Sequence, residues 1–175
     1  METNSPAVSY RGHLQQQIHM GRQMLLGVIL LTLVNIGMLL SNADSYLLFS
    51  VSVPYYLTWF GKLLDNQLSA AWTENGVYTL TGLIIGGVIL AGYFLCWLLS
   101  KKKGHWLWVA AGLLCVDLLA LTAVALWVLR DIGGNLVDIL IHIVAIGQIA
   151  KGASAWKKLQ NQPPEITYTV VTDDL

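Results

Sequence analysis

The sequence predicts an all-α membrane protein, a four-transmembrane-helix bundle with a short re-entrant or interfacial segment on the outer side. The chain has 175 residues, of which 55 % are hydrophobic and only 11 % are charged, whereas soluble domains carry about 25 % charged residues. The apolar residues gather in long stretches, and most basic residues lie between those stretches on one side. These three observations together predict a polytopic protein rather than a soluble domain.

Four apolar stretches each approach the roughly 20 residues needed to cross a hydrocarbon layer about 30 Å thick. Because unpaired backbone groups cost several kcal/mol each in lipid, we expect helices at about residues 23–41, 77–100, 106–129 and 136–156. A cleaved signal peptide is the alternative for the first stretch, but its long apolar core and polar lead favour retention. We assign residues 1–160 to one transmembrane domain, with an outer loop at 42–76 and a flexible cytoplasmic tail at 161–175.

The outer loop contains a second kind of apolar segment, Tyr46 to Phe60, which is short and rich in aromatic residues. Tyrosine and tryptophan prefer the level of the lipid headgroups, and a proline breaks a helix or begins one in its first turn. We therefore predict a re-entrant or interfacial segment, not a fifth crossing, marked by Pro54, Tyr55, Tyr56 and Trp59.

Charge sets the predicted orientation. With four crossings, one side holds eight of the ten basic residues, Arg11, Arg22, Lys101, Lys102, Lys103, Lys151, Lys157 and Lys158. Only Lys62 and Arg130 lie on the other side. The positive-inside rule then places both termini in the cytoplasm, and we expect a multi-pass protein of the plasma membrane. A connection of turn-forming residues, Asp131 to Asn135, is expected between the last two spans.

Four polar side chains inside the spans are candidates for a ligand or ion site: Asp117, Asp138, His142 and Asn35. A carboxylate at the bilayer centre costs at least about 2.5–3.5 kcal/mol, so an intramembrane carboxylate is a functional candidate. Asp117 falls near the middle of its span. Asp138 and His142 are four residues apart and share a helix face, and Asn35 lies at nearly the depth of His142. We predict a polar pocket in the outer half of the bundle.

A structural interpretation stands beside this prediction. Hydrogen bonds between helices, worth about 0.6 kcal/mol each, hold many membrane bundles together. Asn35 is readily explained in this way, and Arg130 is a possible ion-pair partner for Asp138. For Asp117 and His142 both interpretations stay open.

Other classes of function have little support in the sequence. Asp138 and His142 have acceptable spacing for metal ligands, but the remaining histidines lie near the cytoplasmic side, so no third ligand and no metal are expected. No catalytic motif or phosphate loop is present, so we predict no catalytic residues and no cofactor, and an enzyme is the less favoured class. No basic cluster is interleaved with aromatics, which argues against nucleic acid as a partner.

Gly82 and Gly86 have the small-xxx-small spacing typical of close helix contacts. Besides the lipid bilayer, this face predicts a homo-oligomer or another membrane protein as partner. The leading hypothesis is binding or passage of a small ligand, ion or proton through the polar pocket. The alternative is a non-catalytic accessory or scaffold subunit.

Three segments resemble an uncharacterised family of small four-span membrane proteins of Gram-positive gut bacteria: Phe49–Tyr56, Asp138–His142, and Gly152 to Leu159 before Pro163-Pro164. The resemblance implies no known activity, but it implies that the outer loop, Asp138 and His142 are characteristic features. A weaker likeness, to four-span immune-cell proteins with tyrosine motifs, shares only the topology and the tail pattern Ile166-Tyr168-Val171, so we do not carry it further.

Overall fold

The computed structural model describes residues 10–43, 50–68, 76–130 and 132–161, and within these ranges the secondary structure is helical with no strand. Four helices are long and apolar enough to cross a membrane. They are α1 (Tyr10–Leu40), α3 (Val77–Leu99), α4 (Trp106–Ala123), which a π-helical turn η1 (Val124–Leu129) continues, and α5 (Ile132–Gln160). The predicted all-α bundle is confirmed. The tail pattern at Tyr168 lies outside the described residues.

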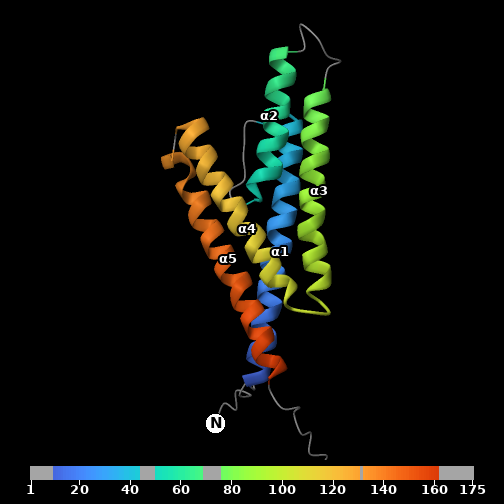
Figure 1. Ribbon diagram of the computed structural model, residues 1–175, viewed down its shortest axis with the longest axis vertical. Coiled ribbons are helices and arrows are strands. Elements are labelled where there is room, and N and C mark those ends of the chain that lie inside the picture. Colours follow the sequence, from blue (N-terminus) through green and yellow to red (C-terminus); the bar gives the residue numbers. More distant parts are fainter. Residues whose placement is uncertain (1–9, 44–49, 69–75, 131, 162–175) are drawn as a thin grey trace, which may run out of the picture.

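One end of the bundle carries most of the basic residues. α1 begins there, α5 ends there, and the connection from α3 to α4, with Lys101, Lys102 and Lys103, lies at the same end (Figure 1). We call this the basic end, and the other the opposite end. At the basic end, α1 and α5 pack closely through Gly21 and Gly152, where an added Cβ on Gly21 would lie 3.3 Å from the Gly152 Cα.

The fifth helix, α2 (Ser52–Leu68), is re-entrant. α1 ends at Leu40 toward the opposite end, whereas α2 begins well inside the bundle and runs back toward that end (Figure 1). Its first residue is buried, since Ser52 and the preceding Val51 are both 0 % exposed. Pro54 lies in this first turn, where its missing N–H removes no helical hydrogen bond. The helix continues past the aromatic segment of residues 46–60 to Leu68.

α2 packs directly against α3 because glycines allow the two backbones to meet. A Cβ added to Gly82 would overlap the carbonyl group of Leu57, and one added to Gly61 would overlap the carbonyl group of Tyr78. Gly86 is also close, with its added Cβ 3.2 Å from the Pro54 Cα. The small-residue face of α3 is therefore covered by α2 of the same chain. This intramolecular contact explains the glycine spacing without a partner.

The remaining interior lies among α1, α4 and α5, where Leu25, Leu107 and Ile149 are 0 % exposed. The outward faces are apolar too, as a lipid environment allows: Val88 on α3 and Leu119 on α4 are 69 % and 71 % exposed. A bundle that is apolar inside and outside is the pattern expected of a protein surrounded by lipid rather than by water.

Two elements differ from the sequence-based prediction. The first helix starts at Tyr10, well before the apolar segment, because Leu14 is buried at 2 % exposure and extends the packed face of α1. The expected turn at residues 131–135 is wrong, because α5 already begins at Ile132. The chain reverses instead at Arg130, which has a left-handed φ of 52°, and the glycines that follow are helical.

Candidate functional site

Three of the four predicted polar residues meet inside the bundle. His142 Nε2 lies 3.2 Å from Asp117 Oδ2, and His142 Nδ1 lies 3.4 Å from Asp138 Oδ1. α4 supplies Asp117 and α5 supplies the other two, and none of the three is more than 2 % exposed. Asn35 is buried on α1 at 1 % exposure. The convergence of α4 and α5 thus brings the ionisable residues to one place.

Asp117 has a second set of partners that the sequence analysis did not predict, the start of α2. The Ser52 amide donates to Asp117 Oδ2 and the Val53 amide donates to Asp117 Oδ1, each at 2.8 Å. A helix N-terminus presents unpaired N–H groups and a partial positive charge, so it favours an ionised carboxylate. Asp117 therefore caps the re-entrant helix.

The residue before α2 also finds an acceptor for its amide. The Val51 amide donates to Thr32 Oγ1 at 2.7 Å, and Thr32 in turn donates to the Val28 carbonyl at 2.7 Å. Pro54 has no N–H to satisfy. A helix can begin inside the membrane only if its free amides find such partners, and here α1 and α4 supply them.

The hydrogen bonds of His142 determine where its protons lie. Nδ1 is 2.8 Å from the backbone carbonyl of Asp138, and a carbonyl only accepts, so Nδ1 carries a hydrogen. Nε2 then faces Asp117 Oδ2, and two lone pairs do not make a favourable contact. One proton is therefore required between them, either on Nε2 as imidazolium beside carboxylate or on Asp117 beside neutral imidazole. The two buried side chains are thus placed to share a proton.

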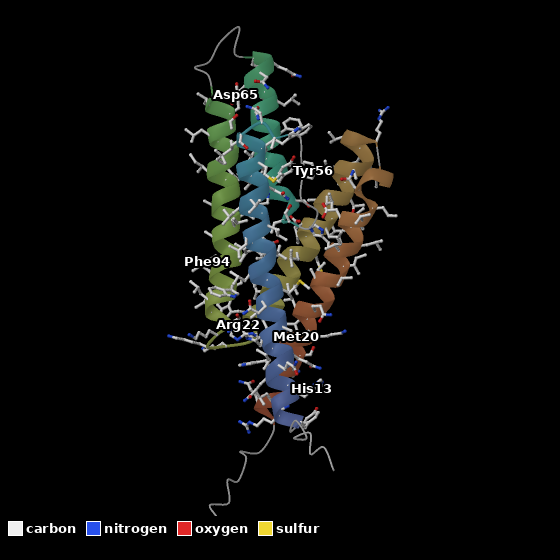
Figure 2. The ribbon with its side chains drawn as sticks, turned by 180° about the vertical axis from the view of Figure 1, so that it is seen from behind. His13, Met20, Arg22, Tyr56, Asp65 and Phe94 are labelled. Carbon is white, nitrogen blue, oxygen red and sulfur yellow. The ribbon has the colours of Figure 1, made fainter. Side chains whose placement is uncertain are left out.

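Aromatic residues of α2 lie beside this pair, toward the opposite end. Tyr56 is on the side of α2 that faces α4 and α5 (Figure 2), and its hydroxyl is 3.5 Å from Asn135 Oδ1. Its ring makes edge contacts with Tyr55 and Trp59, at centroid distances of 5.6 and 6.4 Å. Tyr55, Tyr56 and Trp59 thus form a row along α2. A lipid-accessible groove of about 290 Å³ adjoins this row, lined by Val53, Tyr56, Leu57, Phe60, Ala120 and Val124.

A second carboxylate cap was also missed. Asp65, near the end of α2, accepts hydrogen bonds from the amides of Tyr78 and Thr79 at 3.1 and 2.7 Å and from the Thr79 hydroxyl. Burial acts to raise the pKa of Asp65, but the hydrogen bonds from Thr79 and Tyr78 outweigh it and lower that pKa below its usual range. No local motif links residues this far apart, so sequence inspection gave no signal for this cap.

The four apolar helices and the re-entrant α2 define the class: a multi-pass α-helical membrane protein with buried ionisable residues. Comparison with protein-family models, with curated proteins and with solved structures found no match. Within the residues that the structure describes, no group of three or more histidine, cysteine or acidic side chains is arranged to hold a metal ion. The function is therefore argued from the chemistry of the Asp117–His142 pair.

Proposed function

We propose that this protein binds a small ligand, ion or proton at its intramembrane polar site, and that the species bound is a proton, held by Asp117 and His142. The observation that carries the proposal is the position of His142, whose Nδ1 donates to the Asp138 carbonyl while Nε2 faces Asp117 Oδ2 at 3.2 Å. Intramembrane ionisable groups of this kind are typical of proton relays.

Burial favours a proton over a larger species. Asp117 and His142 are 2 % and 1 % exposed, and the Asp117 oxygens already accept bonds from the amides of Ser52 and Val53 and contact His142 Nε2. A proton needs no cavity, whereas a larger ligand would have to displace the start of α2.

The proton has a consequence for α2 because Asp117 both binds it and caps the helix. Hydrogen bonds to an ionised acceptor are roughly twice as strong as those between neutral groups. When the proton resides on Asp117, the amides of Ser52 and Val53 lose that advantage, and the hold on α2 weakens. The free energy of proton binding and the free energy of α2 docking are thus coupled, so that each event changes the equilibrium of the other.

We further propose that the basic end faces the cytoplasm, so that both termini lie there, and that the membrane is the plasma membrane. Support comes from the excess of lysine and arginine at that end. In this orientation Tyr56 and Asn135 lie between the proton pair and the outside, which makes the external pH the relevant one. A single cysteine introduced as Lys102→Cys should react with an impermeant maleimide only after the cell is opened.

The test of the proposed function is the pH dependence of α2 docking. A single reporter cysteine, Val53→Cys, is introduced after Cys96 and Cys115 have been replaced, and its maleimide labelling rate is measured in proteoliposomes between pH 5 and 8. We expect labelling to accelerate as pH falls, because a second proton taken up by the pair must reside on Asp117 and weaken its bonds to the α2 amides. Adding Asp117→Asn should abolish the pH dependence, because asparagine cannot ionise, and give fast labelling throughout.

Two control variants accompany this test. His142→Gln keeps the Asp117 cap but removes the titrating ring, and should alter the pH response. Asp65→Asn removes the other cap, which has no histidine, and should leave the response of the reporter unchanged. A labelling rate that ignores pH in the unmodified site, or a response that survives Asp117→Asn, would overturn the proposal.

The alternative function, an accessory or scaffold subunit, is favoured by a different observation. The two 2.8 Å bonds from α2 to Asp117 are by themselves a sufficient structural use for a buried carboxylate. In that case Asp117→Asn lowers stability, docking of α2 ignores pH, and a stoichiometric membrane partner co-purifies. A partner that bound through Gly82 and Gly86 would have to displace α2 from α3.

A further inference from the structure

The Ser52 hydroxyl has no hydrogen-bond partner although the residue is 0 % exposed. Among the side-chain atoms that the structure describes, Ser52 Oγ is the one buried nitrogen or oxygen in this condition. A buried hydroxyl without a partner is costly, so native proteins normally provide one, from the chain or from ordered water.

Position in the helix explains why the chain itself offers no partner. Thr58, one and a half turns further along α2 and also 0 % exposed, donates to the carbonyl of Pro54 at 2.9 Å. This is the usual bond of a helical hydroxyl to the carbonyl four residues earlier. Ser52 is the first residue of α2, so no carbonyl of its own helix lies four residues before it.

An acceptor with spare capacity is bonded to the backbone of the same residue. A carboxylate offers about four lone-pair sites, and in Asp117 two accept the amides of Ser52 and Val53 while a third faces His142 Nε2. The Ser52 amide is 2.8 Å from Asp117 Oδ2, so the residue that carries the unpartnered hydroxyl is held at this carboxylate.

We propose that a buried water molecule binds between Ser52 Oγ and Asp117 and is a further partner of this carboxylate, besides His142 and the α2 amides. Buried waters typically join polar groups that would otherwise lack a partner. This water donates one hydrogen to Asp117. It forms a second hydrogen bond with the Ser52 hydroxyl, as either donor or acceptor. It adds a further donor to the ionised carboxylate and so favours that form. The presence of the water is inferred from the geometry alone. Its effect on proton binding depends in addition on the proposed function.

Two variants separate the water from the general packing of α2. Ser52→Ala removes the hydroxyl that holds the water, and Thr58→Ala removes a buried hydroxyl that already has a protein partner. Infrared difference spectra in H₂¹⁶O and H₂¹⁸O report strongly hydrogen-bonded internal water directly. We expect an isotope-sensitive O–H band in the wild type and in Thr58→Ala, and its loss in Ser52→Ala.

The thermal midpoint gives an independent readout of the same variants. If water satisfies the hydroxyl, Ser52→Ala leaves the midpoint unchanged or lower. If the hydroxyl is dry and unpaired, alanine removes an unfavourable group and the midpoint rises. A higher midpoint, no isotope-sensitive band in the wild type, or an experimental structure with Ser52 Oγ bonded directly to Asp117 would each overturn the water site.

The role in proton binding is tested with the Val53→Cys reporter. Loss of a donor destabilises ionised Asp117, so Ser52→Ala should move the pH midpoint of labelling upward by about one unit, a tenfold change in proton affinity, while Thr58→Ala leaves it in place. A water band that disappears without any shift of that midpoint overturns the role of the water in the proton pair. If the wild type shows no pH response at all, the proposed function fails, and the isotope band still decides whether the water is present.

Discussion

Two carboxylates begin two helices of this protein in the same way, and only one of them lies deep in the bundle. Asp117, from α4, accepts the first amides of α2, and Asp65, from α2, accepts the amides of Tyr78 and Thr79 at the start of α3. In both cases the cap comes from a different helix, so each bond also fixes how two helices pack.

The difference between the two caps is their third partner. Asp65 accepts from the hydroxyl of Thr79, which does not titrate in the physiological range, whereas Asp117 faces His142, which is an imidazole. Asp65 belongs to the end of α2, near the start of α3, while Asp117 lies in the middle of α4. Under the proposed function, a helix cap of this kind responds to protons when its third partner can itself carry the proton.

The largest loss of stability should come from removing the cap formed by Asp117. Asp117→Ala leaves the amides of Ser52 and Val53 and the ring of His142 without their acceptor, and breaking a buried pair in this way costs about 3–5 kcal/mol. We expect the free energy of unfolding in detergent to fall by that amount, as followed by reaction of the buried Cys96 thiol with a fluorescent maleimide. Asp65→Ala is the matched variant, and equal losses in the two would contradict the comparison.

The next largest effect should come from the contact that brings Asp65 to α3. Gly82→Ala places a Cβ against the backbone carbonyl of Leu57, and rigid backbone offers no side chain to move aside, so we expect a loss of up to about 3 kcal/mol. Gly87→Ala is the control on the same helix, because an added Cβ meets nothing within 4 Å. The thermal midpoint of Gly87→Ala should match or exceed that of the wild type. A midpoint lowered equally in both would show that α3 tolerates no alanine for some other reason.

A smaller effect is expected from the auxiliary acceptor at the start of α2. Thr32→Val keeps the size of the side chain but removes the oxygen that accepts the Val51 amide, and an unsatisfied buried donor of this kind costs about 1–2 kcal/mol. Hydrogen exchange should become faster at Val51 and stay unchanged at Tyr78, which depends on Asp65. Uniformly faster exchange at both helix starts would mean that the caps are not independent.

The sequence predicted the parts of this structure that depend on hydrophobicity and charge. Four apolar segments predicted the four long helices, and Pro54 with its neighbouring aromatics predicted a re-entrant or interfacial segment. Helix periodicity also placed Asp138 and His142 on one face. What hydropathy cannot predict is which backbone amides a buried carboxylate will cap, because Ser52 and Asp117 are far apart in the chain and neither belongs to a local capping motif.

The prediction of a turn at residues 131–135 was wrong for a related reason. Glycine and asparagine favour turns in isolation, but in the structure these residues continue the helix that carries Asp138 and His142, and α5 begins at Ile132. Likewise, the glycines of α3 predicted a close helix contact but not its partner. The spacing of Gly82 and Gly86 is equally compatible with a second copy, and only the arrangement in space assigns the contact to α2.

The smallest effect concerns the pH dependence of the cap formed by Asp65. Because its hydrogen bonds lower the pKa of Asp65 in the folded protein from 3.8, the cap stabilises the fold fully above the pKa of the unfolded chain, and the contribution is lost as pH falls through the folded value. Asp65→Asn should therefore lower the thermal midpoint at neutral pH, and the difference from the wild type should shrink as pH falls below 3.8 and vanish only below the lowered pKa of the folded protein. Thr79→Val, which keeps both amide bonds but removes the hydroxyl donor, should have part of the same effect. A difference that grows on acidification would mean that Asp65 is held in its protonated form, and the two caps would then differ in charge as well as in their third partner.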